Sequence, residues 1–339
     1  MSWLRINCMR GVRLLIATVI GMSIIGGVGA ASNPDSYADD STPPRREIDR
    51  NAPPIRIAFI SYANPQQVAR DSEAVCRYLE PFLGVPVKGF VTLDYGSSVE
   101  AMRNEQSDLA FVDPLAFMMA HEQIGAKPLV LEVYATGQPT YYSCIWVRKD
   151  SGIRELKDLK DKVIAFADQV DMSGHLMPRD IFVRQGLLPS NRLEGSFFKQ
   201  VYFAGGDEQA IRAVYNGFVD AAGISQFAYL LLRPEERDEI TVIARSIDSL
   251  SHLVMARRNL SDDICERISE ALLSLDSKKP DEKALLDRLY GVQGFVKAKM
   301  SDFADVADIA ERYGFIRNQR AFARPSSESS GQDTPEDRQ

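Results

Sequence analysis

The stretch from Tyr78 to Phe117, "YLEPFLGVPVKGFVTLDYGSSVEAMRNEQSDLAFVDPLAF", alternates strand and helix signals over short connections. "VPVKGFV" (85–91) and the buried-type run "LAFVD" (109–113) predict strands. "SSVEAMRNEQ" between them starts with serine, a favoured helix cap, and Pro114 is suited to the first turn of a further helix. Strands that alternate with helices over short loops predict parallel pairing, with helices covering the sheet.

The same alternation extends to both sides of this stretch. About 260 residues, from Ile55 to about Phe315, are enough for one large or two medium domains. The further predicted strands are 55–60, 128–135, 141–149, 162–168, 199–204, 220–224, 240–246 and 252–258, and the further helices are 65–83, one from Gly174, 207–216, one capped by Ser261, and one from Ser301 to near Gly314.

The N-terminus has the organisation of a secretory signal peptide. Residues 1–13 carry three arginines and no acid, an apolar run covers 14–25, and small residues lead to Ala31. This pattern predicts a signal peptide over 1–31 that is cleaved on export to the periplasm. The apolar run is shorter than the about 20 residues of a spanning helix, although an uncleaved anchor stays an alternative.

Two polar segments flank the apolar-periodic region. "SNPDSYADDSTPPRREIDRNAPP" (32–54) is rich in proline and polar residues and has no apolar period, so we expect a disordered tether. The C-terminal end, 317–339, is predicted to be a disordered tail for the same reason. The domain prediction is therefore a signal peptide, a tether, the α/β region and a tail.

Composition and motifs argue against several classes of function. The formal net charge of −7 disfavours nucleic acid as a partner. Three widely spaced cysteines in the α/β region (Cys76, Cys144 and Cys265) give neither a disulfide framework nor a zinc pattern, so buried free thiols are expected. The chain has no G-x-S-x-G, P-loop, H-E-x-x-H or Gly-rich dinucleotide turn, and its three histidines are far apart. We therefore expect no catalytic residue, no cofactor and no metal ligand.

Four blocks of sequence carry a resemblance to a known family. Together and in order, 78–117, "YYSCIWVRKDSGIRELKDLKDKVIAFAD" (141–168), "SGHLMP" (173–178) and "FAGGDEQAIRAVYNGFVDAAG" (203–223) resemble the solute-binding proteins of phosphate, phosphite and phosphonate ABC transporters. The resemblance extends over nearly the whole region from Ile55 to Phe315.

This resemblance implies the fold of a type II periplasmic binding protein. The expected α/β architecture has two lobes with mostly parallel sheets flanked by helices, and two strands that cross at the hinge. Lobe one would be 55–143 plus 248–316, and lobe two 144–247. A small-molecule ligand would be enclosed between the lobes by hinge closure, and the partner would be an ABC permease in the inner membrane. The protein itself is expected to be a monomer.

Polar loops after the predicted strands could meet at one crevice. In open α/β sheets, ligands bind beyond the carboxyl ends of the strands. Tyr95, Asp113, the segment 171–174 and the segment 205–208 each follow an apparent strand. We expect these four loops to converge on the ligand.

The resemblance assigns roles residue by residue. Tyr95 and Tyr141, with Tyr142 beside them, match tyrosines that face the ligand, and Asp220 matches an acid that can take the ligand's amino group. Ser173 and Gly174 match the end of a Ser-Thr-Ser-Gly helix start that holds the oxyanion. The chain departs from the family at Asp171, Met172 and Asp207, where a serine, a threonine and a histidine are expected. The predicted ligand-binding residues are Tyr95, Asp113, Tyr141, Tyr142, Asp171, Met172, Ser173, Gly174, Asp207 and Asp220.

These departures bear on the class of ligand. A carboxylate 4 Å from a phosphonate costs about 1 kcal/mol in water and more in a closed cleft. Asp171 could instead cap the helix that it begins, and both roles stay open. We expect an amine-bearing or zwitterionic ligand rather than a simple phosphonate. Two other functions stay open: a periplasmic sensor subunit that presents its ligand to a membrane histidine kinase, and an enzyme on the same fold that resembles the thiamine-precursor synthases.

Overall fold

The computed structural model describes residues 43–61, 64–189 and 196–317. All of them belong to one of the two units into which the chain divides, Ser41–Gln339. The predicted signal peptide and most of the predicted C-terminal tail lie outside the described residues.

Strands and helices alternate along the described chain, as the sequence predicts. The strands are β1 (Ile55–Ile60), β2 (Val87–Thr92), β3 (Leu109–Val112), β4 (Lys127–Val133), β5 (Thr140–Tyr141), β6 (Ser143–Arg148), β7 (Val163–Phe166), β8 (Gln200–Phe203), β9 (Ala221–Ser225), β10 (Ile240–Arg245), β11 (Ser249–Leu250), β12 (Leu253–Ala256) and β13 (Gly294–Lys297). The α-helices are α1 (Pro65–Leu83), α2 (Tyr95–Arg103), α3 (Pro114–Ile124), α4 (Met177–Arg184), α5 (Asp207–Tyr215), α6 (Pro234–Arg237), α7 (Asp262–Leu273), α8 (Pro280–Leu286) and α9 (Ala304–Arg312). The shorter helices are η1 (Leu156–Leu159), η2 (Met172–Leu176), η4 (Ala228–Leu231), η5 (Asp287–Leu289) and η6 (Met300–Phe303).

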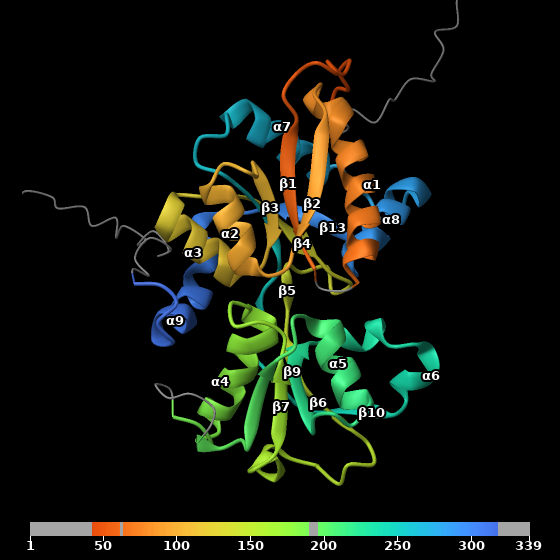
Figure 1. Ribbon diagram of the computed structural model, residues 1–339. Coiled ribbons are helices and arrows are strands. Elements are labelled where there is room, and N and C mark those ends of the chain that lie inside the picture. The colour runs from red at the N-terminus through yellow and green to blue at the C-terminus, as the bar shows by residue number, and fades with distance from the viewer. Residues whose placement is uncertain (1–42, 62–63, 190–195, 318–339) are drawn as a thin grey trace, which may run out of the picture. The chain divides into compact units, whose positions relative to one another are not determined.

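The first lobe is built on a six-stranded sheet of order β13-β4-β12-β3-β1-β2. One face of the sheet packs on α1 and α7, and the other on α2, α3 and α9, so that each face has its own hydrophobic cluster. Figure 1 shows α2, α3 and α9 on the side of this sheet that lies opposite α1. Both faces are covered, which explains why strands such as β3 are apolar at every position.

The second lobe is built on a five-stranded sheet of order β10-β6-β9-β7-β8. The helix α5 and η4 pack on one face, and α4 packs on the other together with the aromatic residues Phe197 and Phe198. A two-stranded ribbon, β5 with β11, joins the lobes, and Tyr141 lies opposite Ser249 in it. The predicted two-lobed α/β class with two hinge strands is confirmed (Figure 1).

The sheets are more mixed than the "mostly parallel" pairing that the resemblance implies. Parallel pairs join β1 to β2 and β3, and β7 to β8 and β9. The strands β12 and β6 pair antiparallel with their neighbours. Each of these two strands follows a hinge strand directly, so no helical crossover forces parallel pairing at that point.

Part of the segment predicted to be a disordered tether lies against the first lobe. The backbone of Arg46 donates to the Pro81 carbonyl at 2.6 Å, and that of Asp49 to Gly84 at 2.9 Å. Arg50 forms an ion pair with Glu80 at 3.0 Å. Hydrogen bonds and an ion pair to the end of α1 therefore hold residues 46–50, although this segment has no apolar period. The domain bounds, including those of the tether, stay predictions.

Candidate functional site

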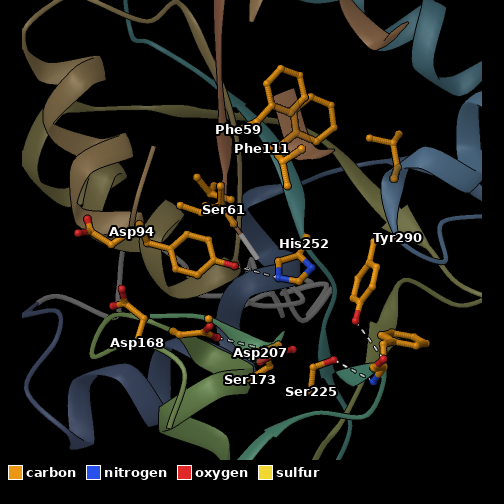
Figure 2. A pocket seen from close by; sticks show the side chains of 18 of the residues that line it. Phe59, Ser61, Asp94, Phe111, Asp168, Ser173, Asp207, Ser225, His252 and Tyr290 are labelled. Carbon is orange, nitrogen blue, oxygen red and sulfur yellow. Dashed lines mark hydrogen bonds between the residues drawn. The ribbon is translucent and has the colours of Figure 1, made fainter. Parts of the chain in front are cut away.

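A cavity lies between loops of the two lobes and contains about 990 Å³ of space, part of it open to solvent. The first lobe contributes the end of β1, the segment after β2 and two residues of β3, and the second contributes residues that follow β7, β8 and β9. Figure 2 shows side chains of both lobes facing this space. Tyr95 and residues of the segments 171–174 and 205–208 therefore line one cavity, whereas Asp113, at the fourth predicted loop, is not among the lining residues. The polar residues that line the cavity are Ser61, Asp71, Ser72, Asp94, Tyr95, Glu132, Tyr134, Asp168, Asp171, Ser173, Asp207, Ser225, His252, Arg288 and Tyr290.

Asp171 caps a helix and also lines the cavity. It is the N-cap of the π-helix η2, where its Oδ1 accepts from the Gly174 N–H at 2.7 Å and from the Ser173 hydroxyl at 3.2 Å. Its side chain also lines the cavity. A Cβ on Gly174 would lie 2.4 Å from the Ala167 Cβ, so only glycine allows this close approach of η2 to the end of β7. Short π-helices of this kind are frequent at functional sites.

Asp113 joins the two lobes from behind the cavity. It caps α3 by accepting from the Ala116 N–H at 2.7 Å, and its second oxygen accepts from the Met172 N–H of the other lobe. Asp113 is fully buried and is not among the lining residues. Its role in the described structure is to hold the Asp171 loop rather than to face the cavity.

Asp207 carries the clearest unsatisfied group of the site. It is the first residue of α5, is 8% exposed and lines the cavity. Its Oδ1 atom is buried without a hydrogen-bond partner in the described part of the chain. Buried polar atoms in native structures nearly always have a partner, so an orphan that faces a cavity indicates a missing ligand or solvent molecule.

The carboxyl groups at this end of the cavity have raised pKa values. Burial raises the pKa of Asp171 to about 6. Burial, with the nearby charge of Asp171 as the second cause, raises the pKa of Asp113 and of Asp207 well above the ordinary range. Burial also raises the pKa of Asp168. A bound cation would therefore stabilise the ionised form of these carboxyl groups.

A hydrogen-bonded chain of four side chains forms the wall opposite the aspartates. Tyr95 Oη lies 3.2 Å from His252 Nε2, His252 Nδ1 lies 3.0 Å from Tyr134 Oη, and Tyr134 donates to Glu132 at 2.9 Å. Burial lowers the pKa of His252 to about 4 and raises that of Glu132 to about 7. With a neutral imidazole and an ionised Glu132, every bond is satisfied if Tyr95 donates to Nε2 and Nδ1–H donates to Tyr134. Tyr95 then presents acceptor lone pairs to the cavity.

Three of these four hydrogen-bonded side chains, Glu132, Tyr134 and His252, were not predicted to be site residues. Glu132 and Tyr134 stand two residues apart in the otherwise apolar strand β4 and its end, and residues at that spacing share one face of a strand. That pair of polar residues was an available signal. His252 was considered only as an isolated histidine, because nothing in the sequence brings it to Tyr95, 157 residues away.

Four other predicted site residues are not among the lining residues of the cavity. Tyr141 is buried with its ring 5.2 Å from that of His252, and its hydroxyl has no hydrogen-bond partner in the described part of the chain. The Arg245 guanidinium lies over the Tyr142 ring at 4.5 Å. Met172 packs into the cluster of the first lobe, and Asp220 accepts from the Val163 N–H at 2.8 Å, at the opposite end of β7 from Asp171. The structure therefore gives these four side chains packing or backbone-capping contacts, whereas Tyr95, Asp171, Ser173 and Asp207 line the cavity.

The described lining residues carry many acids and few cations. Arg288 is the one permanently charged cation among them, and it pairs with Asp71 at 3.0 Å. Within the described ranges, no group of three or more His, Cys, Asp or Glu side chains is placed to hold a metal ion. No helix in the described part of the chain is long and apolar enough to cross a membrane.

Two α/β lobes, joined by a pair of hinge strands and lining one cavity, define a solute-binding protein. The family described as "ABC transporter, phosphonate, periplasmic substrate-binding protein" matches residues 57–303, and the chain belongs to this family. The phosphonates-binding periplasmic protein of Escherichia coli (strain K12) is 30% identical over 242 residues, which is 69% of this chain and 70% of that protein. The phosphate-import protein PhnD of Mycolicibacterium smegmatis is 31% identical over 172 residues, 49% of this chain and 53% of that protein.

Solved structures have the same fold. A binding-protein component of an ABC phosphonate transporter from Pseudomonas aeruginosa superposes with a TM-score of 0.68 at 24% identity, covering 76% of this chain and 86% of the other. PhnD1 of Prochlorococcus marinus in complex with methylphosphonate superposes with a TM-score of 0.69 at 20% identity, covering 77% and 98%. The predicted family and fold are thereby confirmed.

Proposed function

We propose that this periplasmic substrate-binding component of an ABC transporter captures an amine-bearing or zwitterionic small molecule rather than a simple phosphonate. The buried, unpartnered Oδ1 of Asp207 carries the proposal. An ammonium group would satisfy this atom with a charge-assisted hydrogen bond. A phosphonate oxygen in the same place would meet a second acceptor and a like charge.

The surrounding electrostatics support a cation at this end. Asp94, Asp168 and Asp171 line the same part of the cavity, and Arg288 is already paired with Asp71. Tyr95 adds an acceptor when its proton is donated to His252. The protein would bind as a monomer without a catalytic step or cofactor, and would deliver its ligand to the permease after export by the signal peptide.

Calorimetry with a matched pair of probes tests the proposal. Ethylphosphonate and 2-aminoethylphosphonate differ only by the amine, and we expect the wild-type protein to prefer the aminated probe at least tenfold, about 1.4 kcal/mol. Asp207→Asn should remove most of that preference. Asp220→Asn, in the same lobe but outside the cavity, is the control and should leave it unchanged. Equal affinity of the wild type for both probes would contradict an amine site.

A second variant tests Asp171 without removing its cap. Serine caps helices as well as aspartate does, so Asp171→Ser removes the charge and keeps the acceptor for Gly174. We expect ethylphosphonate to bind at least tenfold more tightly to this variant than to the wild type. If its affinity does not rise, Asp171 acts as a cap and its charge does not select the ligand.

A further inference from the structure

The cavity has a second end, inside the first lobe, where the carboxylates of Asp71 and Glu132 are already hydrogen-bonded. We name this part the apolar end; it is lined by Phe59, Val68, Phe111 and Leu289, with Tyr290 at its edge. Figure 2 shows Phe59 and Phe111 on the far side of His252 from Asp168, Ser173 and Asp207. Asp171 and Asp207 therefore lie at one end of the cavity, and the two phenylalanine rings lie at the other.

Polar groups near the apolar end already have partners. The Ser72 hydroxyl donates to the Ala69 carbonyl at 2.8 Å. Asp71 accepts from Gln67 at 2.8 Å and pairs with Arg288 at 3.0 Å, and Glu132 accepts from Tyr134. A bound water needs two to four polar partners, whereas apolar cavities stay dry and take apolar molecules. The apolar end therefore suits hydrocarbon better than solvent.

The wall of the apolar end is aromatic and flat. Phe59 and Phe111 stack with their ring centroids 4.9 Å apart and their planes at 17°. Phe59 lies in β1 and Phe111 in the neighbouring parallel strand β3, so the sheet fixes their positions. A third ring placed beside this pair gains aromatic contact in addition to area burial.

Tyr290 is held in a strained conformation at the edge of this wall. Its φ of 59° lies in the left-handed region, which bulky side chains rarely adopt. Its hydroxyl donates to the Phe227 carbonyl of the other lobe at 3.0 Å, so the ring is fixed across the two lobes. Strained residues of this kind cluster at ligand sites, because the surrounding structure must hold them there.

We propose that the apolar end is a binding subsite for a ring-sized apolar group, and that the ligand is an amphipathic amine with its ammonium at Asp207 and its ring beside Phe59 and Phe111. The proposal rests on the amine site proposed above and adds the chemistry of the rest of the ligand. A small phosphonate would leave the apolar end empty, and the lining residues there would lose contacts that a ring supplies.

Two amines of different size test the subsite on the full chain. Calorimetry with 2-phenylethylamine and ethylamine compares the same ammonium group with and without a phenyl ring. We expect the phenyl compound to bind at least thirtyfold more tightly to the wild-type protein, about 2 kcal/mol. Val68→Phe, which fills the apolar end from α1, should reduce the ratio to within threefold and preserve ethylamine binding. Ala69→Phe adds the same ring on the exposed side of α1 and should leave the ratio unchanged.

The outcomes separate this proposal from the amine site. Binding of both amines with equal affinity by the wild type overturns the subsite and leaves the amine site standing. Binding of neither amine overturns both. Asp207→Asn should weaken both amines by a similar factor, because it removes only the shared ammonium contact. If Val68→Phe fails to fold, the ratio measured on the wild type still decides the question.

Discussion

The carboxyl groups of Asp113, Asp171 and Asp207 hold their protons to a higher pH than exposed aspartates do, because burial disfavours their charge. For Asp171 the pKa in the folded protein is about 6, against an ordinary value of 3.8. Between these two values the folded protein binds more protons than the unfolded chain. Its stability in the empty state therefore falls as pH rises through this range.

We expect the affinity for an amine probe to rise with pH across the same range. An ammonium ion favours ionised carboxylates, so below the pKa of about 6 for Asp171 each bound cation must displace at least one proton. The affinity of ethylamine, which stays an ammonium ion throughout, should increase by up to about tenfold per pH unit below that pKa when it is measured by calorimetry from pH 5 to pH 7.5. Repeating the calorimetry in buffers of different ionisation enthalpy gives the number of protons released when the amine binds, which is a second test.

The opposite sign would identify a different mechanism. A protonated Asp207 can donate to a phosphonate oxygen, and such binding would weaken as pH rises. Affinity for ethylphosphonate that is highest at pH 5 and exceeds that for the amine would contradict the cation site.

For individual residues, the sequence predicted the positions of Asp171 and Asp207 in the cavity better than those of Tyr141 and Tyr142. Asp171 and Asp207 stood out because the resemblance implies a serine and a histidine at these positions, and both side chains line the cavity. Tyr141 and Tyr142 match the family in sequence, but their contacts are set by the packing of the hinge and by Arg245. His252, the partner of Tyr95, comes from the segment after β11, and its other partner, Tyr134, directly follows β4; a single sequence gives no register between such distant segments.

Helix ends show how local signals set the elements around the site. The sequence places the start of α2 at Ser97 or Ser98, whereas the structure uses Asp94, whose Oδ1 accepts from the Ser97 N–H at 2.6 Å. Tyr95 is therefore on the first turn of a helix, not in a loop. The edge strand β13 and the short helix α8 were missed, because four and seven residues give little periodicity.

Helices α4 and α9 make a second contact between the lobes, away from the cavity. Tyr313 donates to Asp180 at 3.0 Å, and Arg312 lies 3.4 Å from the same carboxylate. The Arg179 guanidinium lies 4.7 Å from the Tyr313 ring centroid. Asp180 is buried, and Arg184 of its own helix pairs with its other oxygen, so Oδ1 is the atom that makes the contacts between the lobes.

We expect Tyr313→Phe to weaken binding of 2-aminoethylphosphonate by about fivefold, since one hydrogen bond between the lobes contributes about 1 kcal/mol. The ring and its contact with Arg179 remain in this variant. Calorimetry gives the affinity and thermal unfolding gives the stability of the empty protein. Tyr229→Phe, which removes a hydroxyl from η4, is the control. A lowered melting temperature with unchanged affinity would show that α4 and α9 stay joined without ligand, contrary to this prediction.

At the scale of the whole molecule, the two lobes have separate sheets but share one cluster. Met172, Leu176 and Met177 belong to the second lobe and pack into the cluster of the first, beside Tyr95 and Leu115. Alternation of strands and helices predicted the two sheets from the sequence. The shared cluster was not predicted, because Met172 was read as a substitution in an anion site.

The three described cysteines can show whether the two lobes unfold together. Cys76 and Cys265 lie in the first lobe and Cys144 in the second, all three buried. Burial raises the pKa of Cys76 and of Cys144 to about 12, so neither thiol should react in the native protein at pH 8. As the urea concentration increases, we expect the three thiols to become reactive together. Mass spectrometry of labelled peptides measures the reactivity of each thiol. Labelling of Cys144 at a lower urea concentration than the other two would show that the lobes unfold separately.

The three apolar side chains shared between the lobes, Met172, Leu176 and Met177, should affect the heat-capacity change of ligand binding. Separation of the lobes would expose Met172, Leu176 and Met177 to water, and exposed apolar surface raises the heat capacity. The heat-capacity change of binding should therefore be more negative than the buried surface of a small polar ligand accounts for. The part of the heat-capacity change that the ligand does not account for measures the apolar area of the protein that becomes buried between the lobes.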